Sequence, residues 1–391
     1  MTSYPSTSAL IAISLLLPAQ AGTDPPLVAV TTVEGRRIDG RMETWRLGEP
    51  LRLSSDDGRL EVLPSADLDR LACRAQQHEQ PRGPWRVEMR DGSTLFVELV
   101  GGDERHLTAA HPQFGILRLP LLDVGRVSRV GAKRPAVTGA GDEDQAALAS
   151  GDVIRGTLEA ATEDGFMFVD AETERFLAWK SLSDLVLAGD ERSSPKGLAA
   201  RVHLADGTTI RTGNLRWEAE GVNLSLFDES SVSVPFSALA DVEVEGGRRV
   251  WLSDVPVAAY QSIPYFTTGW PIRVDTSVLG DALTVGGVRF RHGIGLHSAC
   301  RASWKLDGAY DRFRTFAGID DSAGKSADAE LTLELDGKEL ARLEHLVAGQ
   351  PPRRIDVSVA GGKELTIIVG FGERGPVQDR VNIVDAALIR R

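Results

Sequence analysis

The stretch Val-Gly-Gly-Val-Arg-Phe-Arg-His-Gly-Ile-Gly-Leu-His-Ser, residues 285–298, alternates β-forming residues with glycines and holds two of the seven histidines. It lies near the start of a C-terminal region, residues 250–391, that is rich in apolar runs with the spacing of β-strands. We expect strands over 282–290, 302–306, 312–318, 329–335, 353–359, 364–369 and 381–389. Leu335-Asp336-Gly337-Lys338 is a hairpin signal. Because no convincing helix interrupts these runs, we predict a β-sandwich or jelly roll.

Outward from this region, the N-terminal half repeats one short phrase four times. An apolar residue is followed by Pro64, Pro120, Ala178 or Pro235, and further apolar residues come four and seven positions later. The four positions are 56, 58 and 57 residues apart. Pro pre-sets the backbone of a first helical turn, so each phrase predicts such a turn between strands.

These repeats predict an all-β chain of tandem small β-barrels followed by the β-sandwich. Barrels of the SH3-like or Sm-like kind fit this repeat length. The expected repeats span 22–75, 85–130, 148–188 and 200–248, with a linker over 131–147 and the sandwich over 250–391.

The net charge and the N-terminal residues indicate which partners the protein can have and where it is located. The formal net charge of −12 excludes the basic footprint that non-specific nucleic-acid binding needs. Residues 1–21 resemble a signal peptide, with an apolar core at Ala9–Leu17 and an Ala19-Gln20-Ala21 cleavage site. That core is too short to span a membrane. We predict export to the periplasm, the cell surface or the medium, with no membrane span.

The positions of the two cysteines and of two histidines in the N-terminal half do not indicate a reactive or metal-binding site. Cys73 and Cys300 fall in different predicted domains, either as buried apolar side chains or as an inter-domain disulfide, and the sequence leaves both open. His106 and His111 share a loop-like stretch with no third ligand nearby, so we expect surface histidines rather than a metal site.

The C-terminal region resembles the NPCBM family of carbohydrate-binding modules. The resemblance is carried, in the family's order, by the segments 251–254, 291–298, 310–313, 317–321, 335–338 and 379–387. It implies a jelly roll similar to lectin modules of secreted glycosidases, some of which bind galactose-type sugars and hold a structural calcium. The closing segment departs from the family, because Arg380 replaces a His, Asn382 an Asp and Ile383 a Trp.

Sugar recognition needs an aromatic face for the pyranose C–H surface and forked polar groups for vicinal hydroxyls. The candidate residues are Trp270, Arg291, His292, His297, Gln378, Asp379, Arg380 and Asn382. His297 can instead bond buried backbone beside Gly293 and Gly295, where close packing is expected. Asp320 and Asp321 could supply oxygen ligands to Ca²⁺, or simply form a solvated turn.

No G-x-S-x-G, H-E-x-x-H, phosphate-loop or Cys/His metal pattern is present, so we predict no catalytic activity. The leading hypothesis is an exported, non-catalytic protein that holds a glycan in its C-terminal jelly roll. The repeats would act as spacers or dock to an envelope protein partner. One alternative is a structural or protein-interaction scaffold whose jelly roll has lost sugar binding. Another is an accessory subunit that targets a glycoside hydrolase.

Overall fold

The computed structural model describes residues 27–42, 44–55, 58–73, 83–131, 143–170, 173–189, 197–226, 230–263, 269–373, 375 and 377–391. The regular elements in these ranges are β-strands and four short 3-10 helices, which confirms the all-β fold class. The predicted signal peptide lies outside the described residues. Within them, no helix has the length and apolar character needed to cross a membrane.

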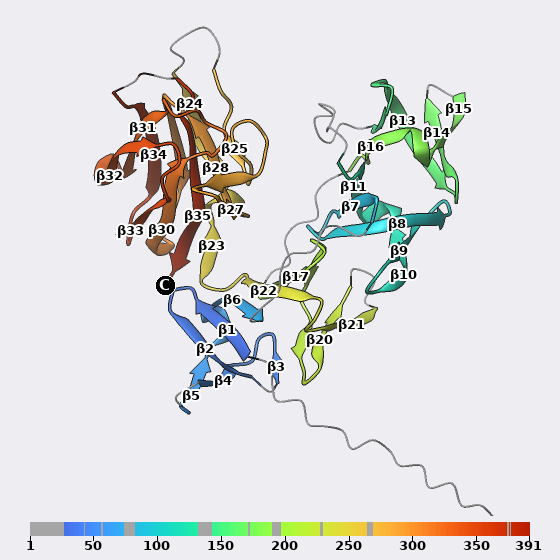
Figure 1. The fold of residues 1–391 in the computed structure, drawn as a ribbon, viewed down its shortest axis with the longest axis horizontal. Helices are drawn as coiled ribbons and strands as arrows, with labels where there is room; N and C mark the ends of the chain where they lie inside the picture. Colours follow the sequence, from blue (N-terminus) through green and yellow to red (C-terminus); the bar gives the residue numbers. More distant parts are fainter. Residues whose placement is uncertain are drawn as a thin grey trace, which may run out of the picture.

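Residues 27–245 form four units with a similar order of strands (Figure 1). Unit 1 contains β1 (Leu27–Thr32), β2 (Arg37–Arg41), β3 (Trp45–Arg46), β4 (Leu51–Ser55), β5 (Leu60–Leu63), η1 (Ser65–Asp67) and β6 (Leu68–Cys73). Unit 2 contains β7 (Trp85–Met89), β8 (Thr94–Gly102), β9 (His106–His111), β10 (Gly115–Pro120), η2 (Leu121–Asp123) and β11 (Val124–Arg129).

Units 3 and 4 follow the same plan. Unit 3 contains β12 (Asp144–Leu148), β13 (Val153–Ala161), β14 (Gly165–Asp170), β15 (Thr173–Ala178), η3 (Trp179–Ser181) and β16 (Leu182–Val186). Unit 4 contains β17 (Ala199–Leu204), β18 (Thr209–Thr212), β19 (Leu215–Trp217), β20 (Gly221–Ser225), β21 (Ser231–Pro235) and β22 (Leu239–Glu245). In every unit the last strand pairs with the first, as β6 does with β1.

The repeated phrase marks the same turn in each unit. Pro64, Pro120 and Ala178 directly precede η1, η2 and η3, which confirms the helical turn expected there. In unit 4 the backbone N–H of Ala238 donates to the carbonyl of Pro235, 2.9 Å away, and closes a comparable turn. The apolar residues four and seven positions after each phrase are buried in all four units. Assignment of the units to SH3-like or Sm-like barrels stays a prediction.

The units pair with one another through their last strands, in a nested order. Unit 1 pairs with unit 4 through β6 and β22, and unit 2 pairs with unit 3 through β11 and β16. Leu71 lies opposite Val242, and Val127 lies opposite Leu185. Each of these four residues stands seven positions after its phrase, so both pairings have the same register.

Opposite charges meet beside each of these pairings. Arg126 of β11 donates from Nε and Nη2 to the carboxylate of Asp184 in β16, with Nε–Oδ1 at 2.8 Å. Arg70 of β6 lies 3.9 Å from Asp241 of β22, measured from Nε to Oδ1. All four residues stand six positions after their phrase. Units 1 and 2 therefore carry arginine at the position where units 3 and 4 carry aspartate.

One continuous apolar core runs through the four units. Units 2 and 4 also meet at His111, which is 2% exposed and lies 3.0 Å from the hydroxyl of Thr208 through its Nε2. The expectation of a surface histidine at position 111 is therefore wrong. A contact between units buries this side chain, and the local sequence gives no sign of it.

The C-terminal domain, residues 249–391, is a β-sandwich with its own core. One sheet contains β23 (Arg249–Trp251), β25 (Arg273–Val274), β28 (Gly293–His297), β30 (Tyr310–Ile319), β33 (Arg353–Ser358) and β35 (Arg380–Arg390). The other contains β24 (Val257–Ser262), β29 (Cys300–Lys305), β31 (Asp328–Leu335), β32 (Lys338–Val347) and β34 (Glu364–Phe371). Trp304 and Phe313, one from each sheet, are fully buried between them.

Two hairpins shape this domain. The hairpin expected at Asp336-Gly337 is confirmed, with Leu335 paired to Lys338 and both turn residues at positive φ. The single strand expected over 282–290 is wrong, because Gly286 and Gly287 both adopt positive φ and turn the chain back. The result is a second hairpin of β26 (Leu283–Val285) and β27 (Val288–Phe290).

Cys73 and Cys300 are both free thiols, so the inter-domain disulfide is absent from this structure. Burial raises the pKa of each thiol to about 12. Thiolate, the reactive form, is therefore scarce at neutral pH, and both side chains behave as small apolar groups.

Candidate functional site

An aromatic pair lies where β28 ends. Trp270 is half-buried, and its ring stacks on His297 with centroids 4.8 Å apart and an angle of 7° between the planes. The hydroxyl of Tyr260 in β24 donates to the carbonyl of Trp270 at 2.6 Å and holds this segment against the sheet. The indole is thus fixed in orientation and partly open. A flat apolar surface of this kind is what the C–H face of a sugar packs on.

A buried carboxylate supports the same edge. Asp379 is fully buried and accepts the hydroxyl of Ser298 at 2.7 Å and the backbone N–H of Asp328 at 3.1 Å. Burial raises the pKa of Asp379, although both hydrogen bonds act in the opposite direction. Because this side chain has no exposed surface, it positions the residue next to His297 rather than offering itself to a ligand.

Gln378 and Arg380 flank Asp379 and are accessible. Gln378 is exposed, and its Oε1 accepts the backbone N–H of Gly324. Arg380 is half-buried, lies opposite His297 in the sheet, and donates from Nη1 to the carbonyl of Ser322 at 2.8 Å. The structure therefore brings Trp270, His297, Gln378, Asp379 and Arg380 to one edge of the sandwich. We call these five residues the Trp270 edge.

Asn382 does not belong to this edge. It is fully buried, and its Nδ2 donates to Asp320 Oδ2 at 2.5 Å and to the carbonyl of Thr284 at 3.3 Å. This placement corrects its predicted sugar contact, because an amide enclosed between the sheet and the 320–324 turn cannot reach a ligand. The side chain instead holds that turn against β35.

The predicted calcium ligands are already hydrogen-bonded. Asp320 is 2% exposed and accepts from Asn382 and from the backbone N–H of Ser322 at 2.9 Å. Asp321 accepts the backbone N–H groups of Gly286 and Gly287 at 2.8 and 2.9 Å, one on each oxygen. The two carboxylates therefore serve to bind loops together here, and calcium at this turn stays a prediction.

Arg291 and His292 lie at a different place, the junction between the C-terminal domain and unit 4. Both terminal nitrogens of Arg291 donate to the carboxylate of Asp241 in β22, each at 3.0 Å. His292 Nε2 lies 3.4 Å from Glu243 Oε2, and its ring stacks on Trp251. The His292 ring is almost fully buried, so it is not open to a ligand, while a sugar role of Arg291, whose side chain is 33% exposed, stays a prediction. A guanidinium fork fits a carboxylate at least as well as paired hydroxyls, and here a carboxylate holds it.

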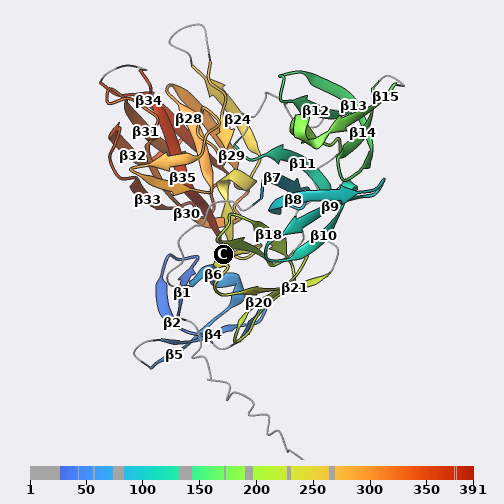
Figure 2. The same cartoon turned by 45° about the vertical axis from the view of Figure 1, so that its right-hand side comes forward.

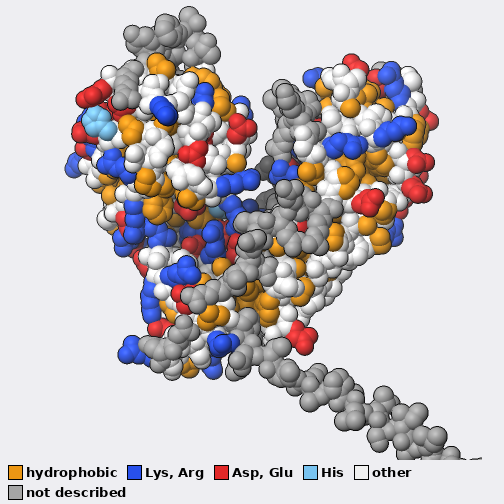
Figure 3. Space-filling model, viewed as in Figure 1, with side chains coloured by type: hydrophobic (Ala, Val, Ile, Leu, Met, Phe, Trp, Pro, Cys, Tyr) orange, Lys and Arg blue, Asp and Glu red, His pale blue; other side chains and the backbone are white. Residues whose placement is uncertain are grey.

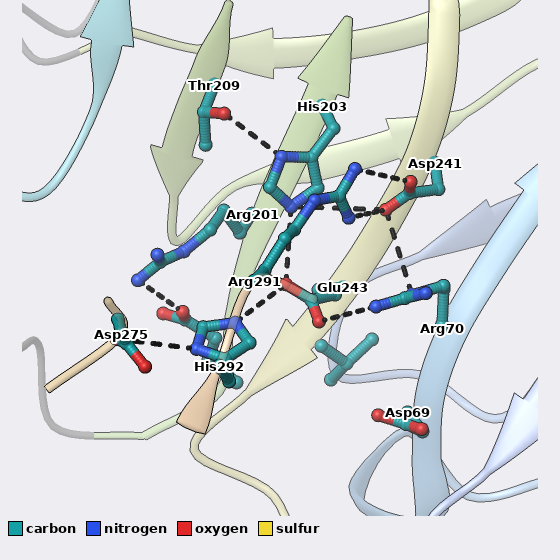
Figure 4. A network of polar contacts seen from close by, with 12 residues as sticks. Asp69, Arg70, Arg201, His203, Thr209, Asp241, Glu243, Asp275, Arg291 and His292 are labelled. Atoms are coloured by element: carbon teal, nitrogen blue, oxygen red, sulfur yellow. Dashed lines mark hydrogen bonds and ion pairs between the residues drawn. The ribbon is translucent and has the colours of Figure 1, made fainter. Parts of the chain in front are cut away.

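Glu243 is the centre of this junction (Figure 4). Its carboxylate is almost fully enclosed and lies near four basic side chains from three parts of the chain. They are Arg70 Nη2 at 3.2 Å, His203 Nε2 at 3.2 Å, His292 Nε2 at 3.4 Å and Arg249 Nη1 at 3.6 Å. Units 1 and 4 and the C-terminal domain therefore share one buried anion.

The two histidines at Glu243 hold different charges. Burial lowers the pKa of His203, and the positive charge of Arg291 adds to this, so the ring is neutral. It donates from Nε2 to Glu243, and its Nδ1 accepts the hydroxyl of Thr209 at 3.0 Å. Burial also acts to lower the pKa of His292, but contacts with Asp275 and Glu243 outweigh it and raise that pKa to about 9. His292 is therefore a buried cation at neutral pH.

The charge of His292 makes the junction sensitive to alkali. A pKa raised from 6.5 to about 9 stabilises the folded state fully below pH 6.5, and this contribution is lost as pH rises through 9. The loss amounts to about 3 kcal/mol. We expect urea midpoints of the wild type to fall between pH 6.5 and 9.5, and those of His292→Gln to fall clearly less. The surface variant His106→Gln should keep the wild-type profile, and an equal slope in all three proteins would refute this role.

Sequence reasoning missed the acceptor residues of the junction. Asp241 and Glu243 lie on a strand of unit 4 that reads as an ordinary amphipathic strand, and Arg70 lies on its equivalent in unit 1. The sequence did carry one signal for Arg70 and Asp241, the charged residue that recurs six positions after each phrase.

On the face in Figure 3, Lys and Arg side chains gather where the C-terminal domain meets the units, below an open hollow. Figure 2 shows the domain above units 1 and 4 from a second side.

Several solved structures are similar to parts of this chain. A CBM51 module from Clostridium perfringens GH95, in complex with methyl-galactose, is 25% identical, with 36% of this chain and 99% of that chain covered and a TM-score of 0.33. CBM51-2 and INT domains of Clostridium perfringens ZmpB, in complex with GlcNAc, are 21% identical, with 43% and 36% covered and a TM-score of 0.33. Tandem CBM51 modules of a family 98 glycoside hydrolase from Streptococcus pneumoniae are 12% identical, with 78% and 88% covered and the same TM-score of 0.33.

No curated protein matches the chain. The sequence profile of the NPCBM/NEW2 domain matches residues 248–389. This range covers the β-sandwich from β23, its first strand, into β35, its last. The motifs that carried the resemblance all fall within this range. The C-terminal part of the chain, residues 248–389, is therefore an NPCBM domain.

Proposed function

We propose that the protein is an exported, non-catalytic carbohydrate-binding protein whose NPCBM domain holds a glycan at the Trp270 edge. The match of residues 248–389 to the NPCBM family carries this proposal. The fixed, partly open indole of Trp270 and the accessible side chains of Gln378 and Arg380 support it. The four units would space the domain from an envelope or dock it to a protein partner there.

The division of roles follows from burial. Trp270 would pack on one face of a sugar ring, while Gln378 and Arg380 would bond its hydroxyls. His297 would support the indole from behind, and Asp379 would hold the backbone at Ser298. Arg291 and His292 are left out of the proposed site because they contact Asp241 and Glu243.

A glycan array with the full-length protein and its Trp270→Ala variant tests the proposal. An aromatic anchor of this kind contributes about 2 kcal/mol, so the variant should bind the selected glycan about 30-fold more weakly. Phe176→Ala is the matched control, because Phe176 is an aromatic residue with an accessible ring (51% exposed) that lies on β15, in unit 3. The proposal fails if a folded wild-type protein binds no glycan, or if both variants bind like the wild type.

A second candidate function is a protein-interaction scaffold whose NPCBM domain has lost sugar binding. The observation that favours it is that three predicted sugar-binding residues, Arg291, His292 and Asn382, are used for internal contacts. A silent array from folded protein would support this second function.

A further inference from the structure

A group of three side chains at the far end of the second sheet has the composition of a metal site. Asp328 begins β31, His345 lies near the end of β32, and Glu373 follows β34. One ligand atom from each of these residues lies within 4.8 Å of the other two. The three neighbouring strands thus bring two carboxylates and one imidazole to the same edge.

The carboxylate of Asp328 is incompletely satisfied. Its side chain is 5% exposed, and Oδ2 accepts the backbone N–H of Glu373 at 3.2 Å. Oδ1 is buried, and no hydrogen-bond donor among the described residues reaches it. A buried carboxylate oxygen that accepts no hydrogen bond is costly. It therefore indicates that a positively charged group belongs next to it.

His345 is placed toward that oxygen but is too far away to bond it directly. Its Nδ1 lies 3.6 Å from Asp328 Oδ1, beyond the ordinary range of an N–H···O hydrogen bond. Two ligands about 2.1 Å from a tetrahedral ion are about 3.4 Å apart, which is close to this spacing. The pairing of β31 with β32 shifts by one residue between Ala329 and Leu331, and His345 adopts a positive φ of 54° there.

Gly372 allows the third residue to approach. A Cβ at this position would lie 2.4 Å from Asp328 Cγ, so only glycine lets the end of β34 pass so close to the carboxylate. Glu373, the next residue, is exposed and can turn its side chain toward the other two.

We propose that Asp328, His345 and Glu373 bind a divalent transition-metal cation of the Zn²⁺ class. One imidazole and two carboxylates with open positions suit such an ion. Calcium prefers six to eight oxygen ligands, which this set does not offer. The site is separate from the Asp320–Asp321 turn, and it does not rest on the proposed glycan binding. A bound ion would tie β31, β32 and Glu373 together beside Asp379, which bonds the backbone of Asp328.

Calorimetric titration of chelator-stripped, full-length protein with Zn²⁺ tests this site. We expect saturable binding that weakens about 10-fold or more in His345→Gln and in Glu373→Gln, because loss of even outer-shell partners weakens metal binding by 10- to 100-fold. Both side chains are exposed, so these variants should fold. His106→Gln is the matched control, since His106 lies 3.2 Å from Asp103 but belongs to no three-ligand group among the described residues.

Two further measurements separate the possible explanations. Co²⁺ used in place of Zn²⁺ should give a visible absorption band that His345→Gln abolishes and His106→Gln retains. Millimolar Ca²⁺ should not displace Zn²⁺. The proposal is overturned if wild type shows no Zn²⁺ binding, if His345→Gln binds like the wild type, or if Ca²⁺ competes on equal terms.

Discussion

Replacing Glu243 with glutamine is expected to destabilise the junction by about 3 to 5 kcal/mol, the range for removing one partner from a buried ionic group. Glu243 has no exposed surface, and its carboxylate neutralises charge from Arg70, Arg249 and His292. Contacts with neighbouring basic groups hold its pKa well below the usual range, although burial acts to raise it. The amide of glutamine keeps the shape but removes the one anion that these three cations share, and each of them keeps only one neighbouring carboxylate, from Asp241, Asp69 or Asp275.

Hydrogen exchange gives the most direct measurement of this effect. Backbone amides of β6 and β22 should lose protection in Glu243→Gln, while amides in the core of the NPCBM domain around Trp304 should not. The same variant should also lose the alkaline stability change assigned to His292, because Glu243 helps to raise its pKa. Glu61→Gln removes a surface partner of Arg36 and serves as the control, with an expected cost below about 1 kcal/mol. Equal effects of the two substitutions would contradict the role assigned to Glu243.

Asp184→Asn is expected to weaken the pairing of units 2 and 3 by about 3 kcal/mol. The Asp184 side chain is 1% exposed and accepts two hydrogen bonds from Arg126, whose side chain is 18% exposed. The neutral amide leaves this guanidinium largely buried without its anion. Thermal unfolding followed by calorimetry would show the loss as a lower midpoint.

A charge exchange separates charge pairing from local packing. Arg126→Asp alone places two carboxylates together and should be the most destabilising of the set. Combining it with Asp184→Arg restores opposite charges at equivalent positions of the two strands and should recover more than half of the loss. If the double variant is no more stable than Arg126→Asp, the pair does not select the partner strand.

Local patterns predicted much of the fold. The repeated phrase placed the turns before β6, β11 and β16, because Pro and buried apolar residues act within a few positions of each other. The Asp336-Gly337 turn was predictable for the same reason. The hairpin at Gly286-Gly287 was missed, since an apolar run with two glycines reads equally well as one strand.

Residue type alone could not assign the candidate site. Arg291 and Arg380 are chemically identical forked donors, and only the tertiary structure places one against Asp241 and the other beside His297. Asp321 likewise fits a calcium ion or two backbone N–H groups, and the position of Gly286 and Gly287 decides which it meets. Contacts between residues 34 or more positions apart determine these outcomes, and the periodicity of the sequence does not reveal such contacts.

The nested pairing of units affects the order in which the chain can fold. Of the four units, unit 1 leaves the ribosome first, yet β22, which pairs with the other edge of its last strand β6, lies about 170 residues later, with Arg70 opposite Glu243. Until then β6 is an open edge, the kind of strand that pairs with other chains and leads to aggregation. Units 2 and 3 are adjacent and can associate early, because closing a short loop costs less entropy. Of the four units, unit 1 is therefore the one that most needs protection by a chaperone during synthesis.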